Sequence, residues 1–204
     1  MEWVARHSDV IDVAVNAGLL VIWALYLHLL LLTFRRQYRP NILINRGGGV
    51  SGGSRCLISN MSTEPIYVQA VILEVGAGDR RWSRRISDVE TLGEAESATS
   101  AIARTRQGPL GKGQFIDIGT IAGLVATALE RVRGDPDAPS GIAGSDWFRI
   151  TVVAVYTSER ELIGATRGFR IAPDGDGLEP VESLARQITS RRERQSLRDA
   201  IAGD

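Results

Sequence analysis

The chain has 204 residues, with 24 basic and 24 acidic side chains, one Cys and two His. This length is enough for one domain, or two small ones, with a core that folds without cross-links. The net charge of zero argues against a dedicated nucleic-acid-binding protein, and the single Cys excludes an internal disulfide and a multi-cysteine metal site. His7 and His28 both lie near the N-terminus, so the rest of the chain has no His for Ser-His-Asp or Cys-His catalysis or for zinc binding. We therefore expect no catalytic residue, no metal site, no cofactor and no nucleic-acid partner.

One apolar run dominates the N-terminal part of the chain. In Val13–Phe34, 18 of the 22 residues are apolar and none is charged. A helix of this length measures about 33 Å, which is enough to cross a hydrocarbon core of about 30 Å. The run exceeds the apolar region of a typical signal peptide, and no small-x-small cleavage site precedes the arginines that follow it. An uncleaved transmembrane helix is therefore favoured over a signal peptide.

The charges on either side of this run predict its orientation. Three arginines follow the run and only one precedes it: Arg35, Arg36 and Arg39 against Arg6. By the positive-inside rule, residues 1–12 lie outside and the C-terminal part lies in the cytoplasm. Arginine outnumbers lysine by 23 to one, which is typical of a GC-rich bacterial genome, so we expect the bacterial inner membrane. The arginines of the basic connector, residues 35–41, fix this topology or, alternatively, rest on anionic headgroups.

A stripe of mostly small residues runs along the predicted span. Its members, spaced three and four residues apart, are Ala14, Ala17, Val21, Ala24 and His28. Small residues let two membrane helices approach closely, and a polar group between them forms hydrogen bonds across the contact. We expect this face to pack on another integral membrane protein or on a second copy of the chain. The alternative is a lone span in which His28 reaches toward the membrane surface.

Residues 42–172 are expected to form one β domain. Alternation, or a short apolar run between turn residues, predicts strands at 41–45, 54–59, 66–75, 80–87, 114–118, 147–156 and 162–171. In 66–75 the alternation places Ile66, Val68, Ala70 and Ile72 on one face. The glycine-rich segment 47–53 is interpreted as a hairpin or linker, because it lacks the Gly-Lys-Ser/Thr ending of a phosphate-binding loop. The weakly patterned segment 88–107 is interpreted as a loop.

The strand at 80–87 carries a candidate basic patch. Its four arginines are Arg80, Arg81, Arg84 and Arg85, of which the first and third share a face with Trp82 and Ile86. Four arginines around a tryptophan are compatible with a nucleic-acid, lipid or small-anion site. We favour a solvated edge strand whose charges prevent aggregation.

Two helices are predicted in the β-rich part. Thr120 is the expected N-cap of an amphipathic helix with apolar residues from Ile121 to Val132 at helical spacing. In the C-terminal segment, residues 173–204, Pro180 is expected to open a helix with Val181, Leu184 and Ile188 on its apolar face. The arginines after Ser190 are expected to project as a basic arm or to fray in solvent. The segment Asp174–Gly177 resembles the start of a calcium loop, but Leu178 and Ala185 stand where ligands would be needed.

The run Leu57–Val68, with its Asn60-x-Ser62-x-x-Pro65-Ile66 spacing, resembles a hairpin that joins two core strands in immunoglobulin-like domains. The resemblance implies an antiparallel immunoglobulin-like β-sandwich, here mainly β, tethered by one N-terminal transmembrane helix and carrying one inserted amphipathic helix and a C-terminal helix. We expect a non-enzymatic accessory or assembly subunit of an inner-membrane complex. The alternative is a tethered sensor that binds a small anionic ligand through the arginines of 80–87. An enzyme would need carboxylates such as Asp117 or Asp146, which no motif pairs.

Overall fold

The computed structural model describes residues 8–37, 40–49, 52–86, 107–132, 135–156, 162–172 and 177–202. The chain divides into two compact units, Met1–Arg39 and Pro40–Asp204. The predicted loop at 88–107, the turn at 157–161 and the calcium-like motif lie, apart from Gln107 and Gly177, outside the described residues.

The first unit contains one long helix, α2 (Ser8–Gln37), which confirms the predicted N-terminal apolar helix and extends it at both ends. Within it, the 26 residues of Asp9–Phe34 are long and apolar enough to cross a membrane, and none of this segment is buried within the chain. Helices have their backbone groups paired internally, which is the condition for crossing a bilayer.

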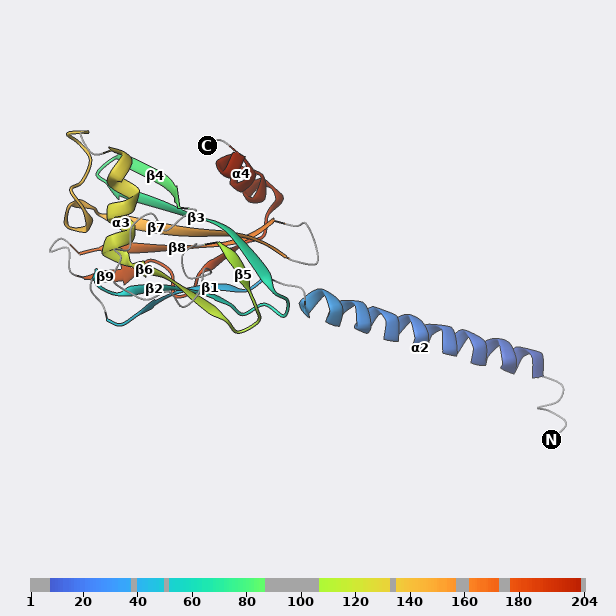
Figure 1. The fold of residues 1–204 in the computed structure, drawn as a ribbon. Coiled ribbons are helices and arrows are strands. Elements are labelled where there is room, and N and C mark those ends of the chain that lie inside the picture. The colour runs from blue at the N-terminus through green and yellow to red at the C-terminus, as the bar shows by residue number, and fades with distance from the viewer. Residues whose placement is uncertain are drawn as a thin grey trace. The chain divides into compact units, whose positions relative to one another are not determined.

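The second unit consists mainly of antiparallel strands in two sheets (Figure 1). Sheet A has the order β1-β2-β6, formed by β1 (Ile42–Gly47), β2 (Arg55–Asn60) and β6 (Phe115–Thr120). Sheet B has the order β10-β8-β7-β3-β4, formed by β10 (Arg186–Ile188), β8 (Leu162–Ile171), β7 (Trp147–Tyr156), β3 (Ile66–Ala77) and β4 (Arg80–Ile86). Two short strands join it: β5 (Gly108–Leu110) pairs with β3, and β9 (Leu178–Pro180) pairs with β8. The β-rich prediction is therefore confirmed.

The two sheets share one hydrophobic core. Alternate residues of each strand point inward, so that Ile44 and Ile58 of sheet A belong to the same buried cluster as Phe148 and Phe169 of sheet B. The two phenylalanine rings stack with centroids 4.9 Å apart. Burial of apolar side chains from both sheets is the main force holding them together.

A β-bulge in β3 overturns the predicted single face of 66–75. The register with β7 shifts between Val68 and Ala70, so the inward face changes phase. Before the bulge Ile66 and Val68 face the shared core; after it the inward residues are Val71, Leu73 and Val75. The residues predicted to continue the inner face, Ala70 and Ile72, instead pack in a second cluster.

The predicted internal helix is confirmed as α3 (Ile121–Leu129), followed by one 3-10 turn at Glu130–Val132. Thr120 is its N-cap, and its hydroxyl accepts a hydrogen bond from Gly123 N at 3.2 Å. The buried face consists of Ile121, Leu124, Val125, Ala128 and Leu129. Through this face α3 packs against β3 and β4. A second 3-10 turn, Ile142–Gly144, precedes β7.

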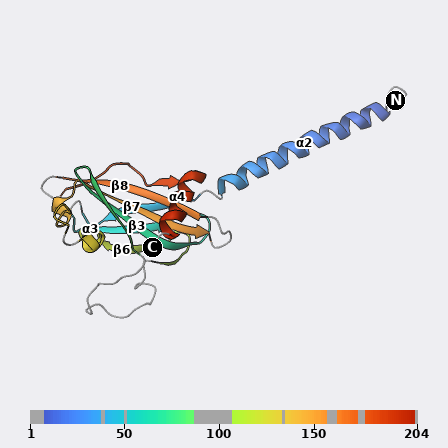
Figure 2. The same cartoon turned by 90° about the horizontal axis from the view of Figure 1, so that it is seen from above.

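The C-terminal helix exists, but the prediction that it opens at Pro180 is wrong. Pro180 ends β9, Val181 and Leu184 are exposed, and Ile188 is buried in β10. The helix is α4 (Arg191–Ala202). It lies on the face of sheet B that points away from sheet A, where it crosses above the strands (Figures 1 and 2).

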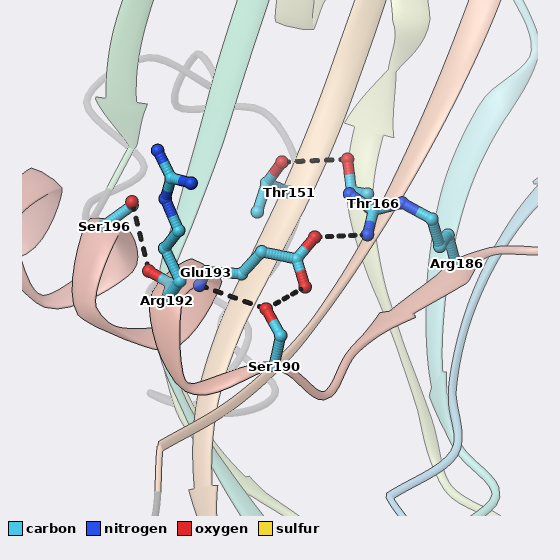
Figure 3. Close-up of polar contacts among 7 residues, drawn as sticks. All are labelled: Thr151, Thr166, Arg186, Ser190, Arg192, Glu193 and Ser196. Carbon is cyan, nitrogen blue, oxygen red and sulfur yellow. Dashed lines mark hydrogen bonds and ion pairs between the residues drawn. The ribbon is translucent and has the colours of Figure 1, made fainter.

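The expectation that the arginines after Ser190 project as a basic arm or fray in solvent is also wrong, because they belong to α4, which packs on sheet B. Leu197 of α4 is buried, together with residues from four strands: Ala70, Val153, Leu162 and Ile188. The helix begins at a capping box, Ser190-x-x-Glu193. Glu193 N donates to Ser190 Oγ at 3.2 Å, and the Ser190 hydroxyl donates to the Glu193 carboxylate at 2.7 Å (Figure 3). Arg186 of β10 forms an ion pair with Glu193 and so ties the start of α4 to sheet B.

Candidate interaction surfaces

The first candidate surface is the stripe on α2. Because the helix is continuous, the regular spacing of Ala14, Ala17, Val21, Ala24 and His28 places them along one side of it. All five are exposed within the chain. Of the juxtamembrane arginines, Arg35 and Arg36 belong to the last turn of α2, and Arg39 lies outside the described residues.

The second candidate surface is β4, the last strand on one side of sheet B among the described residues. Its arginines lie on both faces, as the alternation predicts, and each has polar partners. Arg80 pairs with Asp137 at 2.6 Å and with Asp135 at 3.6 Å, and Arg81 pairs with Glu74 at 3.5 Å. Arg84 pairs with Glu130 at 2.9 Å and donates to Thr127 O in α3. Arg85 donates to Ile201 O in α4. These arginines therefore lie on both faces of β4, and polar groups of neighbouring elements contact each of them.

A small cavity lies between β4 and α3. It has a volume of about 280 Å³ and is lined by Arg81, Trp82, Ser83, Arg84, Arg85, Ala128 and Val132. An anion placed here would meet guanidinium groups. It would also compete with Glu130 and with the Thr127 carbonyl for Arg84, which lowers the gain from binding.

The third candidate surface is the end of the β unit at which the chain enters it, just after Pro40. We call it the proximal end; it comprises Asn41, residues 61–67, residues 111–115 and residues 189–192. Asn41 is held there by two hydrogen bonds, from its N to Ser62 Oγ at 2.9 Å and from Met61 N to its O at 2.8 Å. The chain therefore enters the β unit at a fixed position.

Asn60 organises the proximal end from inside. It is fully buried, and its amide donates to Glu64 O and Leu110 O, each at 2.9 Å. Its Oδ1 accepts from Ser62 N at 2.9 Å. The segment that resembles an immunoglobulin-like hairpin is, however, a crossover from β2 in sheet A to β3 in sheet B, so the predicted hairpin is wrong here. Where the chain passes from one sheet to the other, its backbone groups lose their partners in the sheet, and the Asn60 side chain supplies hydrogen bonds in their place.

Exposed apolar side chains gather at the proximal end. The exposed fractions are 51% for Met61, 40% for Tyr67 and 63% for Phe115. Lys112, in the neighbouring turn, is also exposed. No pattern in the sequence marks these residues as exposed, because alternation identifies which residues share a face and not which end of a strand meets solvent.

Side chains of sheet B bind the outer edge of β1. Gln187 bonds both backbone groups of Ile42, and Arg167 donates to Ile44 O and, at 3.1 Å, to Asn45 Oδ1. Burial lowers the pKa of the Arg167 guanidinium, and the nearby Arg46 lowers it further. These contacts close the two sheets along one side, so this edge of β1 is not free for another strand.

The thiol and carboxylate side chains considered as possible catalytic groups are buried in the core or bonded to neighbouring residues. Cys56 is buried in the core, and burial raises its pKa to about 12, so its thiol is protonated at neutral pH. Asp117 pairs with Arg55 and accepts from Gly119 N at 2.9 Å, and Asp146 accepts from Gly78 N at 2.7 Å. Among the described residues, no three His, Cys, Asp or Glu side chains come together as a metal site.

Comparison of the chain with models of protein families, with curated proteins and with solved structures finds no match.

Proposed function

We propose that this chain is a non-enzymatic, single-span membrane protein that serves as an accessory or assembly subunit of a complex in the bacterial inner membrane. The observation that carries this proposal is the length and exposure of Asp9–Phe34, joined by two residues after Gln37 to a β unit that begins at Pro40. An apolar helix of this length with no covering element is stable in lipid and unfavourable in water.

We further propose that the β unit is an immunoglobulin-like sandwich. In such domains one sheet contains strands A, B and E, and the other contains G, F and C, with C′ beside C in variable-type domains. Taken in chain order, the pairing β1-β2-β6 corresponds to A-B-E, and β8-β7-β3-β4 corresponds to G-F-C-C′. This strand order supports the proposal, and Asn60 lies at the crossover between the B and C positions.

The proposed orientation places residues 1–12 outside and the β unit in the cytoplasm. Its support is the excess of arginines after the span, with Arg35, Arg36 and Arg39 on one side and Arg6 on the other. A thiol introduced by Asp9→Cys should then react with an impermeant reagent on intact spheroplasts. A thiol introduced by Asp79→Cys, in the exposed turn after β3, should react only after lysis.

We propose that the chain binds its partner in the membrane through the α2 stripe. Small side chains at Ala17 and Ala24 allow close helix contact, and His28 supplies a polar group that needs a partner in an apolar environment. The contacting helix is a second copy of α2 or the helix of another integral membrane protein.

Disulfide crosslinking in native membranes tests this face. Ala17→Cys and Ala24→Cys should form crosslinks to a second copy or to one defined protein. Leu19→Cys and Leu30→Cys, on the opposite side of the helix, are the matched controls and should not. The unsubstituted chain is a control for crosslinking through Cys56, which is buried and should not react. Equal crosslinking at all four positions, or none at any, would contradict a specific packing face.

The cavity between β4 and α3 supports a second candidate function, a tethered sensor of a small anion. Phosphate and nucleotides can be compared by thermal shift on the full chain in detergent. A stabilisation lost in Arg81→Gln and retained in Arg170→Gln, an arginine of β8 outside the cavity lining, would favour the sensor. No shift with any anion would favour the accessory subunit.

A further inference from the structure

We infer that the proximal end of the β unit is a second membrane contact, in which Met61 and Phe115 enter the headgroup–acyl boundary and nearby cations bind anionic phospholipid headgroups. This inference rests on the proposed membrane span of α2. It goes beyond that proposal because it assigns a lipid-binding surface to the β-rich part of the chain.

Chain length is the first argument. Only Tyr38 and Arg39 separate Gln37, the last residue of α2, from Pro40. Four peptide links join Gln37 to Asn41, and fully extended they span at most about 14 Å. Chain connectivity therefore keeps Asn41 within this reach of Gln37, and Asn41 is itself bonded to Ser62 and Met61 of the proximal end.

The distribution of exposed apolar side chains is the second argument. Met61 and Phe115 come from neighbouring segments: Phe115 is the register partner of Ser59 in β2, and Asn60 N donates to Gln114 O at 2.9 Å. Both side chains are more than half exposed, and Tyr67 at the same end is 40% exposed. Among the described residues of the β unit, the other large apolar side chains with comparable exposure are Val181 and Leu184. An aromatic and an aliphatic residue exposed at one tip suit insertion into a membrane interface.

Charge is the third argument. Lys112 is exposed in the turn before Phe115. Arg191 and Arg192 are exposed in the first turn of α4, a few residues after Gln187, whose side chain is bonded to Ile42 at the start of β1. The nearby acid Glu193 is held by Arg186, and Glu64 is half-buried. Among the described residues of the proximal end, these cations therefore have little competing negative charge, and an anionic leaflet would attract them.

The test uses the full chain reconstituted into vesicles of equal parts phosphatidylglycerol and phosphatidylcholine. An environment-sensitive fluorophore is attached in turn through Met61→Cys, Phe115→Cys and the control Asp79→Cys, an exposed site in the turn between β3 and β4. Buried Cys56 does not compete for the label. Fluorophores at 61 and 115 should shift to the blue and be quenched by a quencher carried on lipid, whereas the fluorophore at 79 should report water. The triple change K112Q/R191Q/R192Q should reduce both effects, as should replacing phosphatidylglycerol with phosphatidylcholine.

The outcomes separate this inference from the proposed span. If the chain resists alkaline carbonate extraction but the fluorophores at 61 and 115 behave like that at 79, the second contact is overturned and the span stands. A blue shift without lipid quenching indicates contact with protein and also overturns it. If carbonate extracts the chain, the span is wrong and the inference falls with it.

Discussion

Gln187 and Ile42 are joined by two hydrogen bonds across the two sheets. Ile42 N donates to Gln187 Oε1 at 3.0 Å, and Gln187 Nε2 donates to Ile42 O at 2.8 Å. Ile42 is the first residue of β1 in sheet A, and Gln187 is the middle residue of β10 in sheet B. The carboxamide therefore takes the place of a neighbouring strand. It also fixes the first strand after the helix to one of the last elements of the chain.

We expect Gln187→Glu to lower the free energy of unfolding by about 1–3 kcal/mol, because it removes the donor to Ile42 O and places a carboxylate against that carbonyl. Urea unfolding of the full chain in detergent, followed by tryptophan fluorescence, measures the effect. Gln195→Glu is the matched control. Gln195 is exposed on α4, where its amide donates to Asp199 Oδ1 at 3.0 Å, and losing this surface contact should change stability by less than about 0.5 kcal/mol. Equal effects of the two substitutions would show that the contact with Ile42 contributes little.

Asn60 should be more sensitive than an ordinary surface asparagine. Asn60→Ala leaves two carbonyls and one N–H without their partner at a fully buried position, so we expect a loss of about 2–4 kcal/mol in the free energy of unfolding. Asn41→Ala is the control, because the Asn41 side chain is exposed and the contacts of that residue come from its backbone. A stable Asn60→Ala chain would mean that water replaces the buried amide.

Loss of the capping box should destabilise α4 without affecting the sheets. Ser190→Ala removes the acceptor for Glu193 N and should cost about 1 kcal/mol of helix stability. Hydrogen exchange should then accelerate in 191–202 and stay unchanged in β7. Ser196→Ala, on the same helix, removes only a hydroxyl that donates to Arg192 O (Figure 3) and serves as the control. Unchanged exchange in both variants would indicate that Leu197 and the ion pair at Arg186 hold the helix without its cap.

Local patterns predicted an element correctly where residues within that element determine its type. The alternation in 147–156 and the Thr120 cap identify β7 and α3 correctly, since their buried faces are set by residues within each element. The bulge in β3 could not be predicted, because residues on both sides of it are apolar and fit either phase. The α2 helix could be predicted because its length and apolar composition belong to one continuous run, although the partner of that helix could not.

Other features depend on residues far apart in the chain. The spacing of Val181, Leu184 and Ile188 imitates a helix, and pairing with β8 overrides it. The true start of α4 did carry a readable signal, Ser190-x-x-Glu193, which the apolar spacing obscured. The bond between Gln187 and Ile42 joins residues 145 positions apart, and no local pattern predicts it.

Because the Cys56 thiol is buried, the free energy of unfolding should depend on pH in the alkaline range. Burial, and secondarily the charge of Asp117, raises the pKa of this thiol from an ordinary value of 9.0 to about 12. Between these two pH values the unfolded chain releases a proton that the folded chain retains, so the stabilisation is complete below about 9 and is lost as the pH rises toward 12. The loss is at most about 1.4 kcal/mol per pH unit. Urea unfolding across this range should show a steeper decline for the unsubstituted chain than for Cys56→Ala, which has no thiol. Parallel declines would show that Cys56 ionises in the folded protein nearly as easily as in the unfolded one.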